Sequence, residues 1–255
     1  MKDIQSTTKY ELKKFQGKDV MNHKLFQGAI YKTIQRLITG KNEDGIKLDL
    51  PRLPMSTKQL VEGRLGKLRK LTYATKADMS FLGFNFLDTC TAVLPNPNGN
   101  DVKFEHEHPL IYTLNPKTKL NSSYTLDITQ EQYDSSKGFK LTAEQVNELK
   151  NNPYALPKVR RAFWEYQFEG DIQLTKDYIT DVVRNLEMGF DYSMGLYLPL
   201  SKGLRLFSVC NVDSNHKSNA VSNGNLDYNS NCLVGVLTDP ELVAEKTGIP
   251  LEELV

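Results

Sequence analysis

The sequence predicts an α+β fold in which helices pack on antiparallel β-hairpins. Three observations lead to this class. Apolar residues recur at three- and four-residue spacing in several segments, which is typical of amphipathic helices. Clusters of turn-forming residues separate pairs of strand-like runs, which indicates hairpins. The helical and strand-like segments do not alternate along the chain, so the β-α-β rhythm of a parallel sheet is missing.

The composition indicates an ordinary globular protein. The chain has 255 residues, of which 39% are hydrophobic and 25% are charged, and this length suits one large domain or two small ones. We expect a polar N-terminal arm over 1–17 and a single α+β domain over 18–255. The formal net charge is +1, so no overall field attracts nucleic acid or an anionic membrane, and such a partner needs a local patch.

Cysteine usage and hydropathy predict where the protein resides. The three cysteines, Cys90, Cys210 and Cys232, are odd in number and far apart, which argues against a disulfide framework and favours a reducing compartment. The first residues lack the apolar stretch of a secretory signal, and no run of about 18 apolar residues could span a bilayer. We therefore expect a soluble protein that is cytoplasmic at synthesis, with no membrane partner.

The N-terminal part is expected to hold two helices. In the first, over 19–39, apolar residues recur on one face, with Asp19 as the N-cap and Gly40 at the end. The second, over 56–73, begins at Ser56 with a Ser-x-x-Gln pattern that is typical of a capping box.

A long hairpin is expected over 79–114. Two prolines, three asparagines and a glycine form a turn over 95–100, between strand-like runs over 79–94 and 101–114. Arms of 14 to 16 residues exceed the usual strand length of about 5–6 residues. We therefore expect the hairpin to project from the body and to lie against a neighbouring subunit, which would also cover its edge hydrogen-bonding groups.

The rest of the chain is expected to mix helices with one further hairpin. Threonine caps precede helical stretches at Thr129, Thr142 and Thr175. The other expected elements are a helix over 157–168, a helix over 175–188, a hairpin over 189–211 turning at 201–203, a loop over 213–230, a strand over 231–237 and a C-terminal helical tail over 239–255.

Two sets of residues are candidates for partner binding. The second helix and the segment after it carry a basic run over 58–76 that could lie along phosphates or against an acidic protein surface. Its candidate residues are Lys58, Arg64, Lys67, Arg69 and Lys70. The expected hairpin tip contributes Asn96, Asn98 and Asn100.

The tetrapeptide over 105–108 is the strongest chemical motif. On a strand, alternation would direct His106 and His108 to one face, and two imidazoles could begin a metal site. A structural zinc site needs four ligands and a catalytic site about three, and no spaced Cys or His motif supplies the others. Phosphate-loop, dinucleotide-binding and nucleophile-elbow motifs are also missing. The sequence therefore predicts no metal, no cofactor and no catalytic residue.

These observations favour a structural subunit of a larger symmetric complex, such as the head-to-tail connector or tail ring of a phage virion. Its partners would be other protein subunits, including copies of itself in a ring. The alternative is a nucleic-acid-binding or processing protein that uses the basic run over 58–76. A metal-dependent enzyme at His106 and His108 is a more distant alternative.

Overall fold

The structure is a computed structural model. It describes residues 12–15, 18–21, 23–68, 86–151, 157–186, 194–198, 202–210, 218–221 and 225–255.

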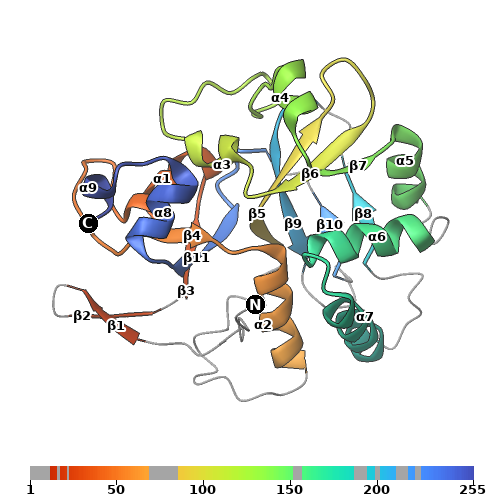
Figure 1. The fold of residues 1–255 in the computed structure, drawn as a ribbon, viewed down its shortest axis with the longest axis horizontal. Coiled ribbons are helices and arrows are strands. Elements are labelled where there is room, and N and C mark those ends of the chain that lie inside the picture. Colours follow the sequence, from red (N-terminus) through yellow and green to blue (C-terminus); the bar gives the residue numbers. More distant parts are fainter. Residues whose placement is uncertain are drawn as a thin grey trace.

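A mixed sheet of nine described strands forms the centre of the molecule (Figure 1). The main order is β3-β11-β5-β9-β10-β8, while β4 also pairs with β11 and β6 joins β5 to β7. The strands are β3 (His23–Gln27), β4 (Arg52–Pro54), β5 (Phe86–Pro95), β6 (Val102–His106), β7 (Phe139–Leu141), β8 (Leu196–Tyr197), β9 (Arg205–Cys210), β10 (Ala220–Val221) and β11 (Cys232–Leu237).

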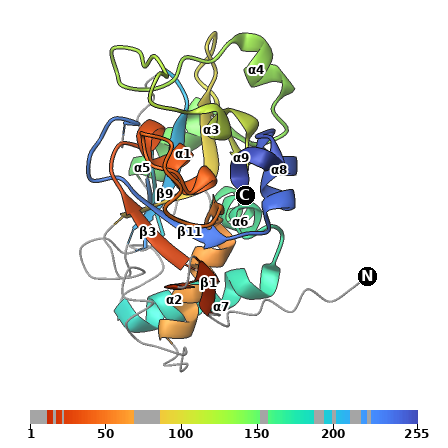
Figure 2. The same ribbon diagram turned by 90° about the vertical axis from the view of Figure 1, so that its left-hand side faces the viewer.

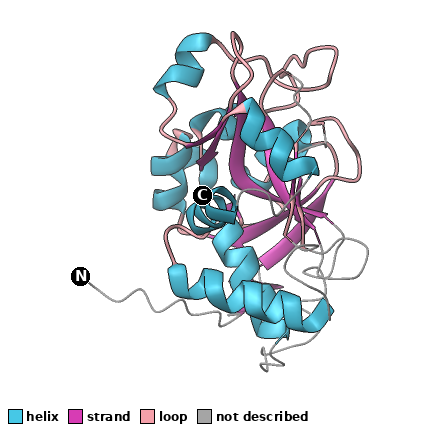
Figure 3. Cartoon of the chain, turned by 90° about the vertical axis from the view of Figure 1, so that its right-hand side faces the viewer, coloured by secondary structure: helices cyan, strands magenta, loops and turns pink. Residues whose placement is uncertain are grey.

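Helices cover both faces of this sheet, as Figures 2 and 3 show from opposite sides. One layer holds α2 (Thr57–Leu68), α5 (Ala143–Asn151), α6 (Pro157–Gln167) and α7 (Ile172–Leu186). The other holds α1 (Ile30–Thr39), α3 (Pro109–Thr113), α4 (Gln130–Ser135), α8 (Pro240–Thr247) and α9 (Leu251–Leu254). Of the helices that the structure describes, none combines the length and the apolar character needed to cross a membrane.

Each helix layer has its own hydrophobic core, and β5 contributes to both. Val93 packs in the core of α2, α5, α6 and α7, which is centred on buried aromatic residues such as Trp164 and Phe207. Ala92 and Leu94 point to the opposite core, beneath α1, α3, α8 and α9. Alternation along a strand explains why neighbouring residues enter different cores. The α+β class is thus confirmed.

The expected projecting hairpin is not what the structure contains. β5 and β6 do form an antiparallel hairpin, but β9 lies along the other edge of β5. β5 is buried from Leu87 to Leu94, and at Asp88 it also forms a parallel bridge to β11. The second arm is a strand only to His106, because Glu107 has a left-handed φ of 51° and α3 follows. The hairpin is therefore part of the central sheet, and residues 79–85 lie outside the described residues.

Two other expectations fail because strand pairing joins distant segments. The expected hairpin over 189–211 does not form between β8 and β9, since β10, from the expected loop over 213–230, pairs with both. The helix expected over 19–39 begins only at Ile30. The segment before it forms β2 (Lys18–Met21), paired with β1 (Leu12–Phe15), and then β3, paired with β11.

Most of the residues that cap the ends of helices were predicted correctly. Gly40 ends α1 with a φ of 67°. At the start of α2 the Ser56 amide donates to Gln59 Oε1, and the Gln59 amide donates to Ser56 Oγ, as in a capping box. Reciprocal bonds of this kind also cap α4 at Thr129 and α5 at Thr142. The helix expected to start at Thr175 instead starts at Ile172.

Candidate functional site

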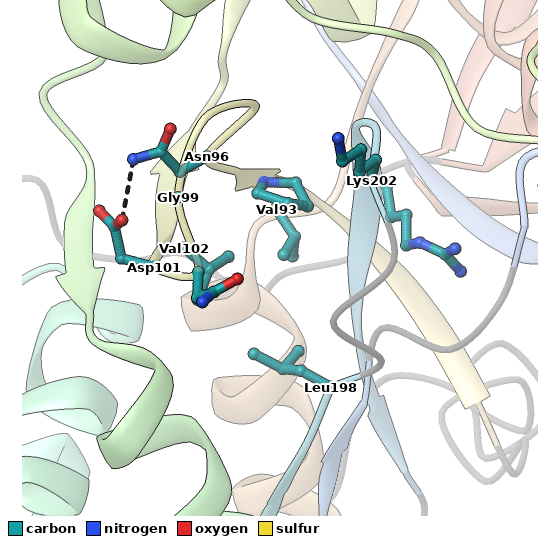
Figure 4. A pocket seen from close by; sticks show the side chains of 10 residues that line it. Val93, Asn96, Gly99, Asp101, Val102, Leu198 and Lys202 are labelled. Carbon is teal, nitrogen blue, oxygen red and sulfur yellow. Dashed lines mark hydrogen bonds between the residues drawn. The ribbon is translucent and has the colours of Figure 1, made fainter.

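The candidate site is a pocket between the β5–β6 turn and the start of β9 (Figure 4). Its cavity volume is about 80 Å³, well below the range of about 300–1,000 Å³ found for ligand pockets, so it has room for a side chain rather than for a whole small molecule. It is lined by Val93, Pro95, Asn96, Gly99, Asn100, Asp101, Val102, Leu198, Lys202 and Arg205. Two of the asparagines predicted as partner-binding residues, Asn96 and Asn100, thus border one cavity.

The β5–β6 turn forms the first wall and is fixed by Asn96. The backbone amide of Asn96 donates to the Asp101 carbonyl at 2.9 Å. The side chain of Asn96 accepts from the Asn98 amide at 3.0 Å and donates to Asp101 Oδ1 at 2.8 Å. A short amide side chain that bonds to nearby backbone stabilises such a turn. Asn98 and Asn100 are both exposed, but of the two only Asn100 lines the pocket.

Asp101 is the acidic residue of the pocket lining, and its charge is compensated. Lys140 Nζ lies 2.7 Å from the Asp101 carboxylate, and the Tyr133 hydroxyl donates to the same group. Burial acts to raise the pKa of Asp101, but the bonds from Lys140, Tyr133 and Asn96 together hold it well below its ordinary value. Asp101 is therefore ionised and paired, so it does not cancel the positive charge on the opposite wall.

The second wall is the turn that leads into β9. The Lys202 carbonyl accepts a hydrogen bond from Thr125 Oγ1 at 2.8 Å, and Leu204 pairs with Leu126. Gly203 has a φ of 95°, and a Cβ there would lie 2.2 Å from Thr125 Oγ1, so only glycine fits. This packing holds the backbone of Lys202 at the pocket mouth, across from Asn96 and Asp101 (Figure 4).

The charge of the second wall is positive. The Lys202 side chain is exposed and makes no ion pair with any residue that the structure describes. Arg205 is buried at the pocket, and burial lowers the pKa of its guanidinium, although arginine stays protonated at neutral pH. The floor between these groups is apolar, formed by Val93, Val102 and Leu198. Lys202 beside this apolar floor therefore suits a ligand that carries both a negative charge and an apolar group.

The basic run over 58–76 does not form a continuous exposed face in the described part of α2. Arg64 is buried, and its guanidinium donates to the carbonyls of Cys210 and Val209 at 2.5 and 3.1 Å. Lys58 lies 3.8 Å from the Asp171 carboxylate. Lys67 lies in α2, but its side chain is not described, and Arg69 and Lys70 lie outside the described residues.

The two histidines do not share a face, because the positive φ of Glu107 interrupts the strand between them. His106 Nδ1 bonds to Thr91 Oγ1 at 2.8 Å, its Nε2 bonds to the Tyr166 carbonyl at 2.9 Å, and its ring stacks on that of Tyr166. His108 instead caps α3 by accepting from the Leu110 amide. No group of three metal-ligating side chains occurs among the described residues.

Comparison with protein-family models, with curated proteins and with solved structures finds no match to this chain. The pocket itself therefore carries the functional interpretation. Sequence reasoning missed Lys202 and Arg205, although the turn at 201–203 was predicted. Only the pairing of β5 with β9 reveals that this turn lies beside Asn96.

Proposed function

We propose that this protein is a subunit of a larger protein assembly and that its pocket binds an acidic, partly apolar segment of a partner chain. The observation that carries this proposal is the position of Lys202, an exposed cation that makes no ion pair with a described residue, beside the apolar floor of the pocket. Apolar contact would supply affinity, and the Lys202 ammonium would select and orient an acidic partner. A ring, such as a phage connector or tail ring, would be built from repeated contacts of this kind.

The alternative of nucleic-acid binding through the run over 58–76 has less support. Phosphate binding requires exposed cations, whereas Arg64 is buried and Lys58 pairs with Asp171. The described part of α2 therefore favours a structural role for these charges.

Lys202→Glu is expected to weaken association with a partner chain at least about tenfold, because it places a negative charge against an acidic ligand. The fold should be unaffected, since Lys202 is exposed and exposed charges contribute little to stability. Native mass spectrometry of the purified chain, alone and with the products of neighbouring genes, measures the association.

Lys117→Glu is the matched control, because Lys117 is also an exposed loop lysine and makes no ion pair with a described residue. This variant should associate like the wild type. Equal association of the wild type and Lys202→Glu would refute the role of the pocket. Failure of the wild type to bind any copy or tested partner would refute the assembly function.

A further inference from the structure

We infer that two matching turns, over 121–124 and 225–228, form a binding surface for a neutral oligosaccharide. The two segments are far apart in the sequence, yet each begins with an asparagine and has a tyrosine three residues later. This surface is distinct from the pocket, and its binding of a sugar does not depend on the proposed function.

The two segments fold in the same way. In each, the side-chain oxygen of the asparagine accepts from the backbone amide two residues later, at 2.9 Å for Asn121 and at 3.2 Å for Asn225. The tyrosine amide donates to the asparagine carbonyl, at 2.9 Å for Tyr124 and at 3.4 Å for Tyr228. Asparagine stabilises turns through such bonds. The Leu226 amide also donates to the Tyr124 carbonyl at 2.8 Å, so the two turns lie side by side.

Both turns present their tyrosine to solvent. Tyr124 is 52% exposed and Tyr228 is 57% exposed. Tyr124 has a φ of 56°, a left-handed conformation that is rare for an aromatic residue. Asn121 imposes it by also accepting from the amide and the hydroxyl of Thr125. Backbone strain of this kind concentrates at binding sites, and a fixed tyrosine offers a large contact area at a low entropy cost.

The charges around the two turns do not favour a nucleic acid. The charged residues within 121–127 and 225–231 are Asp127 and Asp227, and neither segment contains a cation. Lys32 and Lys202 adjoin these segments, so their charges offset the two carboxylates rather than create a positive surface. Phosphate binding requires exposed cations, so the surface favours a ligand without charge.

The other side chains of the surface are polar and uncharged. Four of them are exposed: Ser122, Ser123, Asn229 and Ser230. Hydroxyl, amide and carboxylate groups can donate to or accept from the hydroxyl groups of a sugar. The apolar face of a tyrosine ring packs against the C–H groups of a sugar ring. Two tyrosines on adjacent turns therefore suit two sugar units of one oligosaccharide.

Saturation-transfer difference NMR tests this inference with neutral hexasaccharides of glucose, mannose, galactose and N-acetylglucosamine at millimolar concentration. At least one of them should bind the wild type. Tyr124→Asn and Tyr228→Ser should each weaken that binding at least about fivefold, because aromatic residues dominate the energy of such contacts. Asparagine tolerates the left-handed conformation of residue 124, so that variant removes the ring and keeps the turn. Tyr228→Phe should retain most of the affinity.

Tyr197→Ser is the matched control, because Tyr197 is an exposed tyrosine of β8, outside the two turns. It should bind the hexasaccharide like the wild type, and a short oligothymidylate should bind none of these proteins. Failure of all the hexasaccharides to bind, equal binding by every variant, or binding of the oligothymidylate in their place would refute the inference. The role of Lys202 in association with a partner chain would be unaffected by that result.

Discussion

Arg64→Ala is expected to lower the free energy of unfolding by about 3–6 kcal/mol. The substitution removes two charge-assisted hydrogen bonds, each worth about 1.5–3 kcal/mol, and leaves a buried cavity. The bonds join α2 to the end of β9, through the carbonyls of Val209 and Cys210, so helix and sheet would lose a direct connection. Urea denaturation followed by circular dichroism measures the change.

Lys58→Ala on the same helix is the control for Arg64. Lys58 is partly exposed, and its ion pair with Asp171 spans 3.8 Å, so its loss should cost less than about 1 kcal/mol. Similar, small effects of both substitutions would show that Arg64 does not connect α2 to β9. Arg64→Lys should be intermediate, because one ammonium cannot reproduce the fork of a guanidinium.

Asp88→Asn is expected to remove a pH dependence of stability worth about 3 kcal/mol. Asp88 is buried where β5 meets both β9 and β11, and burial raises the pKa of its carboxyl group to about 6. The Ser208 hydroxyl and the Cys232 amide donate to this carboxylate and offset part of the rise. Because the pKa is higher in the folded state, the native protein binds the proton more tightly than the unfolded chain.

The direction in which pH changes the stability follows from this difference in pKa between the folded and the unfolded state. The wild type should lose stability as the pH rises from about 4 to about 6, and the loss should be constant above that range. In Asp88→Asn the new amide can donate to Ser208 Oγ and accept from the Cys232 amide, so the contacts of the site are kept. The difference in unfolding free energy between variant and wild type should therefore change by about 3 kcal/mol between pH 4 and pH 7. If the unfolding free energies of the variant and the wild type differ by the same amount at every pH, the burial of an ionisable Asp88 is contradicted.

Features that depend on local sequence could be predicted, and features that depend on strand pairing could not. The caps at Ser56 and Thr129 and the end of α1 at Gly40 are set by interactions over a few residues. The length of the strand-like run that contains β5 was interpreted as a sign that the hairpin over 79–114 projects from the body of the molecule. A strand that is paired at both edges and buried on both faces is also long and apolar, so the pattern alone does not distinguish the two.

The candidate site also combines one feature that local sequence predicts with others that only strand pairing creates. The turn chemistry of Asn96 was visible in the sequence, and Asn96 fixes one wall of the pocket. The opposite wall comes from Lys202 and Arg205, more than 100 residues later in the chain, and β9 brings it there by pairing with β5. Arg64 belongs to the predicted basic run, but its burial follows from the packing of α2 on β9, which no local pattern reveals.

The central claim is that another protein chain occupies the pocket, and site-specific photo-crosslinking tests it most directly. A benzophenone amino acid in place of Asn100, an exposed residue of the pocket rim, should form an intermolecular adduct. Mass spectrometry should locate that adduct in an acidic segment of a partner chain. The same probe at Lys117 should give little adduct. Exclusively intramolecular products from position 100, or equal yields from both positions, would contradict the claim.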